Sequence, residues 1–320
     1  MRHAVREWLS RYAPVGVVAI GLSGGGDSLA LTAAAVAEAE AVDALVVDHR
    51  LQDGSGAVAA EAAAAALRLG CRTARVLAVE VGSAGGIEAA ARRARYAALD
   101  EARDGLPVLL GHTLDDQAET VLLGLARGSG GRSIQGMTEF AEPWGRPLLG
   151  VRREVTRQLC ADLGLTPWED PHNSAPEFTR VRLRAEVLPL LEEVLGGGVA
   201  AALARTAAQL REDGAALDSV AENLLKAARD GSGLELETLT TAEPALRRRV
   251  IRAWLLGGGA KSLTDSNLRA VEALVTDWHG QGGVAVSGSA TGTRLVAARE
   301  HGRLILGSDH GESDRGRHHH

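Results

Sequence analysis

A short run of glycine and hydroxyl residues near the N-terminus has the composition of an anion-binding loop. Ser23-Gly24-Gly25-Gly26-Asp27-Ser28 follows the apolar run at 15–21 and precedes a helix expected over 29–37. Glycines let the backbone approach an anion closely, and the N-terminus of the following helix adds partial positive charge. The serines supply hydroxyl donors, and Asp27 supplies a carboxylate for a metal ion beside the phosphates. The run predicts a phosphate cradle, with an ordinary glycine turn as the alternative.

The spacing of this loop excludes two familiar phosphate-binding motifs. No Gly-Lys-Ser/Thr follows the glycines, as a Walker A loop requires, and the G-x-G-x-x-G dinucleotide fingerprint is absent. Ser-Gly-Gly-x-Asp-Ser instead resembles the pyrophosphate loop (PP-loop) of the N-type ATP pyrophosphatases. This resemblance implies that ATP is cleaved between its α and β phosphates, with adenylation of a substrate.

Three acidic residues gather at the start of a helix expected over 115–126. Thr113 with Asp116 three residues later has the pattern of a capping box, which does not account for Asp115 and Glu119 as well. Clustered carboxylates repel each other unless a cation is bound, and Mg²⁺ or a substrate ammonium group are the candidates. Compensation of the helix dipole is the alternative explanation.

Two further places carry side chains suited to a nucleotide. Asp48 and His49 follow a second apolar run, where contact with adenosine and an ordinary strand-end cap are equally good interpretations. On the helix expected over 87–103, Arg95 lies beside a face that carries acidic, basic and aromatic groups at four-residue spacing. That face is suited to neutralising phosphates, but it is also typical of a solvated, salt-bridged helix.

A strip of arginines in the middle of the chain has the charge for contact with nucleic acid. Arg180, Arg182 and Arg184 would share one face of a strand, whereas in a helix Arg180 and Arg184 would do so. Arg127 ends the acidic helix and runs into a glycine-rich loop. Contact with phosphates and a solvated linker are both reasonable interpretations of the strip.

The first half of the chain predicts the elements that position these residues. Strands are expected at 15–21, 41–48, 74–81 and 106–111, with helices at 29–37, 57–69, 87–103 and 115–126. This alternation predicts an α/β fold with a doubly wound parallel sheet, whose ligands bind outside the carboxyl ends of the strands. The motifs at that edge are therefore expected to lie together.

The alternation of strands and helices gives way to a different pattern of elements near Leu195-Gly196-Gly197-Gly198, which indicates a domain boundary. We predict a PP-loop catalytic domain over 1–194, a smaller, mostly helical or mixed C-terminal domain over 195–308, and a flexible tail with a partial histidine tag over 309–320. Helices are expected at 243–256 and 264–278, and short strands at 284–287, 294–298 and 304–307. Arg247-Arg248-Arg249 is either a phosphate-binding patch or a charged helix face.

Composition limits the classes of protein that remain. A net charge of −6 over 320 residues means that any nucleic-acid contact must be a local patch. Cys71 and Cys160 form no Cys-x-x-Cys motif, which favours a reduced, cytoplasmic protein. No signal-peptide core is found, and no apolar run approaches the roughly 20 residues that span a bilayer.

Together, the motifs resemble bacterial tRNA(Ile)-lysidine synthetase over about residues 15 to 190. The most specific are His-Thr-Leu-Asp-Asp-Gln-Ala-Glu-Thr from His112 onward, and Asp-Pro-His-Asn from Asp170 onward with the arginine strip that follows it. Arg50-Leu51-Gln52 departs from the Gly-Leu-Arg that is frequent in the family, so a phosphate contact by that family arginine is not carried over.

The resemblance implies an ATP- and Mg²⁺-dependent ligase that acts on tRNA, with the domain over 195–308 expected to contact the tRNA. It joins free L-lysine to carbon 2 of the wobble cytidine of CAU-anticodon tRNA(Ile), through an adenylated cytidine, and it implies a homodimer. The residues implied to bind ATP or pyrophosphate are Ser23, Gly24, Gly25, Gly26, Asp27, Ser28, Asp48 and His49, and those implied in catalysis are Asp27, Asp116, Arg95 and His112. Mg²⁺ binding is implied for Asp27 and Asp116, and lysine binding for Asp115, Asp116 and Glu119. Binding of tRNA is implied for Arg127, Arg180, Arg182 and Arg184.

Other classes of function remain as alternatives at this point. A pyrophosphatase of the NAD or GMP synthetase type would act on a small nucleotide, and needs no second domain with arginine clusters. A tRNA thiolase would need paired cysteines, which this sequence lacks. A non-catalytic tRNA-binding protein would have no use for the acidic residues beside the loop.

Overall fold

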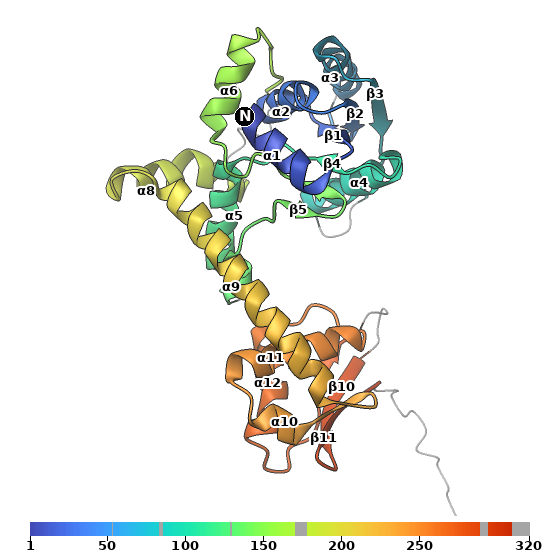
Figure 1. Ribbon diagram of the computed structural model, residues 1–320, viewed down its shortest axis with the longest axis vertical. Coiled ribbons are helices and arrows are strands. Elements are labelled where there is room, and N and C mark those ends of the chain that lie inside the picture. Colours follow the sequence, from blue (N-terminus) through green and yellow to red (C-terminus); the bar gives the residue numbers. More distant parts are fainter. Residues whose placement is uncertain (53, 83–85, 129, 170–177, 289–293, 309–320) are drawn as a thin grey trace, which may run out of the picture. The chain divides into compact units, whose positions relative to one another are not determined.

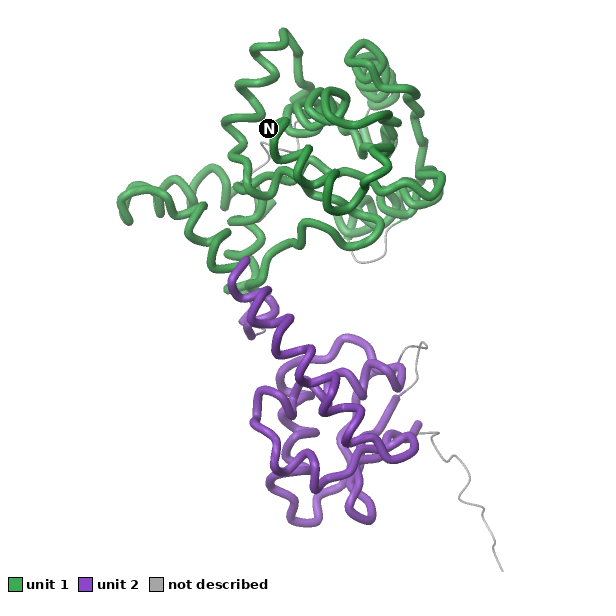
Figure 2. The backbone as a smooth tube through the Cα atoms, viewed as in Figure 1, with its two compact units in different colours: residues 1–126, 134–207 green, residues 127–133, 208–320 purple. Residues whose placement is uncertain are grey.

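The computed structural model describes residues 1–52, 54–82, 86–128, 130–169, 178–288 and 294–308 (Figure 1). The contacts divide the chain into two units, residues 1–126 with 134–207 and residues 127–133 with 208–320 (Figure 2). The predicted motif at 170–173, Ser129 of the glycine-rich loop and the tail from 309 lie outside the described residues. The domain boundary expected near Leu195 remains a prediction.

A six-stranded sheet in the order β3-β2-β1-β4-β6-β5 forms the centre of the first unit. Its strands are β1 (Val17–Leu22), β2 (Ala41–Asp48), β3 (Thr73–Ala78), β4 (Val108–Leu109), β5 (Phe140–Ala141) and β6 (Trp144–Gly145). Every pairing is parallel except that of β5 with β6. The predicted doubly wound parallel sheet is confirmed. β5 and β6 could not be predicted from the sequence, because strands of two residues are too short to show a period.

Helices cover both faces of this sheet. The first unit contains α1 (Arg2–Tyr12), α2 (Gly26–Val36), α3 (Ser55–Leu69), α4 (Ile87–Ala102), α5 (Leu114–Arg127), α6 (Arg153–Asp162), α7 (Thr179–Arg182) and α8 (Leu188–Val194), with a π-helical turn over Leu183–Val187. Side chains of β1 alternate: Ile20 packs in the core formed with α1, α2, α3 and α6, and Ala19 packs on the opposite side with Leu99 of α4. This alternation is that of a strand buried on both faces.

The strand order reverses between β1 and β4, which is the usual place for a ligand in a doubly wound sheet. The chain leaves β1 into the loop at 23–28, and it leaves β4 at Gly111. A Cβ atom at Gly111 would lie 3.0 Å from the backbone C and O atoms of Asp27 and from the backbone N of Ser28. Gly111 therefore lets the end of β4 pack directly against the backbone of the loop.

The second unit contains a five-stranded antiparallel sheet in the order β7-β8-β11-β10-β9. Its strands are β7 (Arg229–Asp230), β8 (Gly233–Glu235), β9 (Val284–Ser287), β10 (Arg294–Glu300) and β11 (Arg303–Ser308). Its helices are α10 (Leu236–Thr240), α11 (Pro244–Gly257) and α12 (Asp265–Thr276). The part of α9 (Val199–Ala228) that follows Ala207 also belongs to this unit, and a 3-10 turn at Gly131–Ile134 begins in it. Leu234, Ile251 and Leu255 are fully buried in its core.

The proposed phosphate patch at Arg247-Arg248-Arg249 is not a continuous exposed surface. Arg247 is buried, and its guanidinium donates to the carbonyl oxygens of Leu239 and Ala242 at 3.0 and 2.6 Å. Arg248 donates to Glu272 at 3.0 Å. The phosphate-binding interpretation is therefore wrong for Arg247, which ties α10 to α11.

In the part of the chain that the structure describes, no single helix is long and apolar enough to cross a membrane. The stretches 179–194 and 199–228 pass that test only together, and the chain bends by 95° between them.

Candidate active site

A cavity of about 630 Å³, here called the nucleotide cavity, lies at the carboxyl edge of the sheet in the first unit. The sequence-predicted residues that line it are Ser23, Gly25, Gly26, Asp27, Ser28, Arg95, His112, Asp116 and Arg184. These residues come from the loop after β1, the region after β4, α4 and the helical stretch near 184. The structure thus brings together most of the residues that the sequence placed at this edge.

The loop at 23–28 keeps its shape through its own serines. The Ser28 hydroxyl donates to the Gly25 carbonyl at 2.9 Å, and the hydroxyls of Ser23 and Ser28 lie 3.1 Å apart. Gly24 has a φ of 80°, a conformation that favours glycine, and its carbonyl accepts from the backbone N–H of Trp168 at 3.0 Å. Since α2 begins at Gly26, the loop ends on a helix N-terminus that favours anions.

Asp27 and Asp116 come from different elements and contact the same guanidinium. Arg153 donates from Nε to Asp27 Oδ2 at 3.0 Å and from Nη2 to Asp116 Oδ1 at 2.5 Å. Asp27 Oδ1 also accepts from the hydroxyl of Thr156. The Arg153 side chain is 12% exposed. Burial opposes its charge, but the adjoining carboxylates outweigh that effect and raise the pKa of Arg153 above its usual value.

The two carboxylate oxygens of Asp116 have different partners. Oδ2 accepts from both the backbone N–H and the hydroxyl of Thr113 at 2.8 Å, which confirms the predicted capping box at the start of α5. Oδ1 faces Arg153, with Arg184 at 3.5 Å. Burial raises the pKa of Asp116, but the Arg153 charge and the Thr113 hydrogen bonds more than offset it, so the pKa lies below its usual value.

Glu119 lies one turn further along α5 and is completely buried. Arg184 Nε donates to its Oε1 at 2.8 Å, and Arg153 Nη1 does so at 3.4 Å. Arg180 lies 3.9 Å from Oε2, so the two arginines that share a helix face both approach this acid. The clustered acids were expected to need a bound cation, and arginines of the protein itself supply positive charge there.

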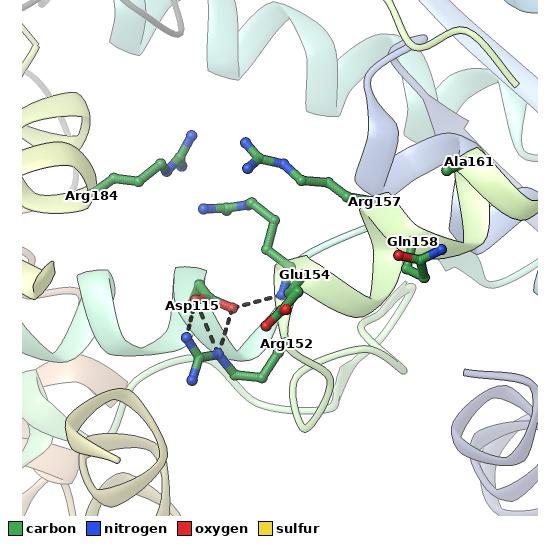
Figure 3. Close-up of a pocket in the computed structure, with 8 residues that line it drawn as sticks. Asp115, Arg152, Glu154, Arg157, Gln158, Ala161 and Arg184 are labelled. Carbon is green, nitrogen blue, oxygen red and sulfur yellow. Dashed lines mark hydrogen bonds and ion pairs between the residues drawn. The ribbon is translucent and has the colours of Figure 1, made fainter. Parts of the chain in front are cut away.

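Asp115 does not join this group, although it adjoins Asp116 in sequence. Its carboxylate accepts from the backbone N–H of Arg153 at 2.7 Å and pairs with the Arg152 guanidinium at 3.2 Å (Figure 3). It therefore caps the start of α6 and lines a different cavity. Its partners therefore differ from those of Asp116 and Glu119, and its predicted lysine contact remains a prediction.

His112 and Arg95 line the nucleotide cavity as expected. Burial lowers the pKa of His112 to about 3, and burial also lowers the pKa of Arg95. Among the described residues, His112 Nδ1 is buried with no hydrogen-bond partner, and the same holds for His49 Nδ1. The imidazole of His112 is neutral at physiological pH, so it is suited to a hydrogen bond with a ligand rather than to a charge interaction.

Replacement of His112 by glutamine should make the protein less sensitive to acid. The difference between the two pKa values of His112 costs no stability above the unfolded-state pKa of 6.5. As the pH falls from 6.5 toward the folded-state pKa of about 3, the free energy of unfolding decreases. Through that window the unfolded chain binds a proton that the folded protein does not, at a cost of up to about 1.4 kcal/mol per pH unit. Urea unfolding between about pH 7 and pH 4 should show the steeper loss of stability in the unsubstituted protein. Parallel curves for the two proteins would contradict this.

A smaller cavity of about 120 Å³ lies beside the loop and is lined by Ser23, Asp48, His49 and Trp168, among others. Asp48 Oδ1 accepts from the backbone N–H of Arg50 at 3.0 Å, so it does cap the strand end. Burial lowers the pKa of His49, and the nearby Arg95 charge adds to the effect. A neutral imidazole and an indole at the edge of the phosphate loop form a surface suited to a nucleoside.

Two predicted tRNA-binding arginines lie outside this cluster. Arg182 pairs with Glu186 at 2.9 Å and is exposed. Arg127 ends α5 and belongs to the second unit. Their predicted roles remain predictions.

Arg153 is the residue that sequence reasoning missed. Its one available signal was its position, because Arg152 and Arg153 fall near the start of α6, where the helix dipole disfavours cations. Two arginines at such a place indicate acidic partners elsewhere in the chain.

The donor set at Asp27 and Asp116 fits Mg²⁺. Hard carboxylate oxygens suit this ion, which usually takes one or two carboxylates and completes its shell with water and substrate phosphates. Both carboxylates contact the guanidinium of Arg153, so they already face one cationic group of the protein. Within the described ranges, no group of three or more acidic, histidine or cysteine residues gathers for a metal ion, which leaves the remaining ligands to the substrate.

A glycine and serine loop lies where the strand order of the parallel sheet reverses, with carboxylates beside it. This arrangement defines a PP-loop nucleotide-binding protein. The PP-loop domain family matches residues 3–191, and the TilS substrate binding domain matches residues 234–305. The tRNA(Ile)-lysidine synthase of Nocardia farcinica is 71% identical over 96% of this chain and 97% of its own length. That of Rhodococcus erythropolis is 69% identical over 96% of this chain and 94% of its own. The chain belongs to the tRNA(Ile)-lysidine synthase family.

A solved structure supports the fold independently of these relatives. The U34-tRNA thiolase of Methanococcus maripaludis, solved with its iron–sulfur cluster, has a TM-score of 0.53 and 18% identity. The match covers 66% of this chain and 78% of the thiolase. At this identity the likeness shows the fold alone.

Proposed function

We propose that this chain is a ligase that forms lysidine on an isoleucine tRNA. The oxygen on carbon 2 of the wobble cytidine of the CAU anticodon attacks the α-phosphorus of ATP and releases pyrophosphate. The ε-amine of free lysine then attacks carbon 2 and displaces AMP, which leaves with that oxygen. The match to tRNA(Ile)-lysidine synthases over nearly the whole chain supports this proposal. It does not favour a small-nucleotide synthetase or a non-catalytic tRNA-binding protein.

The observation that carries the proposal is the convergence of Asp27 and Asp116 on Arg153. Asp27 belongs to the phosphate loop, whereas Asp116 and Glu119 belong to the acidic helix. The group that cleaves ATP and the group suited to an amine therefore adjoin at one guanidinium. The proposed reaction requires this adjacency, because ATP activates the oxygen on carbon 2 of the cytidine and the amine then attacks that same carbon.

In this proposal the loop at 23–28 holds the phosphates, and Arg95 offers a charged guanidinium to the same cavity. Mg²⁺ bound by Asp27 and Asp116 would stabilise the negative charge that develops during adenylation. His112 would donate or accept one hydrogen bond as a neutral ring. The small cavity at Asp48, His49 and Trp168 would take the adenosine.

We assign recognition of the lysine ammonium group to Asp116 and Glu119 rather than to Asp115. A carboxylate whose pKa lies below its usual value binds an ammonium ion well but is a weak proton acceptor. Asp116 therefore acts mainly through its charge. The incoming ammonium group would share these carboxylates with Arg153 and Arg184, or take the place of one of them.

The tRNA is proposed to contact the arginines near 184 and the second unit, which contains the TilS substrate binding domain match. Because tRNA, ATP and lysine are all substrates, the proposed enzyme acts in the cytoplasm. A homodimer is also proposed, and sedimentation equilibrium would test it.

One assay tests the proposed function directly. The protein is incubated with ATP, labelled lysine and a CAU-anticodon tRNA(Ile) transcript, and each component is omitted in turn. We expect label in the tRNA, with AMP and pyrophosphate released, only when all three are present. Release of pyrophosphate with a small nucleotide acceptor and no labelled tRNA would assign the chain to another reaction.

A further inference from the structure

A second cavity of the first unit, here called the outer cavity, adjoins the nucleotide cavity. It has a volume of about 510 Å³ and shares Arg153, Arg157, Ala161 and Arg184 with the nucleotide cavity. Its other lining residues are Asp115, Arg152, Glu154 and Gln158. All residues of the phosphate loop are described, and none of them lines the outer cavity. It therefore extends away from the position of the ATP phosphates.

Arg157 differs from the other arginines of the outer cavity. Arg152 pairs with Asp115, while Arg153 and Arg184 pair with buried carboxylates. Arg157 forms no hydrogen bond or ion pair in the part of the chain that the structure describes. Its N–H donors are therefore free for an anion from outside the protein.

The geometry of the outer cavity favours an anion between Arg157 and Arg184. Figure 3 shows these two side chains extending toward each other across the cavity, from α6 and from the helical turn at Leu183–Val187. Glu154 lies apart from them, beside Asp115 and Arg152. Two guanidinium groups that face the same space match the oxygens of a phosphate group.

We propose that Arg157 and Arg184 bind a backbone phosphate of the RNA substrate where the two cavities meet. This inference rests on the proposed function. A base that reacts with ATP must enter the nucleotide cavity, while the sugar–phosphate chain attached to it stays outside. The outer cavity adjoins the nucleotide cavity, and it carries positive charge without a phosphate loop of its own. Such a contact fixes the register of the RNA and does not read its sequence.

Replacement of Arg157 by methionine tests this site, because it removes the charge and keeps the aliphatic length. We expect the Kd and the KM for tRNA to rise about tenfold, and the slope of log affinity against log salt to fall by about one. The kcat and the KM for ATP should stay unchanged. Arg157→Lys should recover part of the affinity. Arg68→Met is the matched control, since Arg68 is an exposed arginine that pairs with Glu61 and lines neither cavity.

Two results would overturn the inference. One is an unchanged tRNA affinity and salt slope in Arg157→Met; the other is a higher KM for ATP with unchanged tRNA affinity, which would assign Arg157 to the triphosphate. The tRNA affinity is measured without ATP and lysine, so it reports on this site even if the unsubstituted protein makes no lysidine. That last outcome would count against the proposed function alone.

Discussion

Replacement of Asp116 by asparagine should reduce lysidine formation by about a thousandfold or more, comparable to the loss of a main electrostatic group in other active sites. Asparagine keeps an oxygen that can accept from Thr113, so the start of α5 is retained. It removes the negative charge that faces Arg153 and Arg184. The reaction then loses a carboxylate proposed both for Mg²⁺ and for the lysine ammonium group.

The fold of this variant should survive, because Arg153 keeps Asp27 and Glu119 as partners. We expect a loss of about 1–2 kcal/mol in the free energy of unfolding, as for a hydrogen bond to a charged group. The assay measures labelled lysine in tRNA, and thermal unfolding measures the fold. Asp100→Asn is a suitable control, since Asp100 is an exposed acid that pairs with Arg103 on α4. Near-normal lysidine formation by Asp116→Asn would remove this residue from the catalytic set.

Replacement of Gly111 by alanine should impair the use of ATP although Gly111 bears no functional group. The new Cβ would lie 3.0 Å from three backbone atoms of Asp27 and Ser28, and backbone cannot rotate away as a side chain can. The phosphate loop must therefore shift by a few tenths of an ångström. Small displacements of reacting groups are costly, so we expect kcat/KM for ATP to fall roughly tenfold to a hundredfold. Overpacking should also cost about 1–3 kcal/mol of stability.

Pyrophosphate release at varied ATP concentration measures this effect, and thermal unfolding separates it from loss of folded protein. Gly150→Ala is the matched control, because its Cβ would meet nothing within 4 Å and its φ is not positive. If Gly111→Ala has the same kcat/KM for ATP as Gly150→Ala, the end of β4 does not position the loop.

The parallel sheet could be predicted because β1 and β2 are buried apolar runs, each followed by a helical pattern. The strand predicted at 41–48 matches β2, and the strand predicted at 284–287 matches β9. The predicted strand-end motifs met at one edge for the same reason, since carboxyl ends of parallel strands share an edge. The capping box at Thr113 and Asp116 was readable because it depends on residues only three apart.

Contacts between distant residues could not be predicted in this way. Arg153 meets Asp27 across 126 positions and Asp116 across 37, and no local pattern encodes either pairing. Asp115 and Asp116 are adjacent and chemically equal, yet only the packing of α6 decides that Asp115 caps that helix. Arg247 shows the same limit, because its burial depends on how α10 packs against α11.

The two carboxylate oxygens of Asp116 have different tasks, and this restricts which substitutions at position 116 evolution can accept. One of its oxygens closes the first turn of α5, while the other belongs to the chemistry. Apart from asparagine, which keeps the oxygen that accepts from Thr113, a replacement of Asp116 also removes the cap of the helix on which Glu119 lies. Selection for a different substrate therefore has to work around this position, through residues such as Arg153, whose replacement leaves the cap intact.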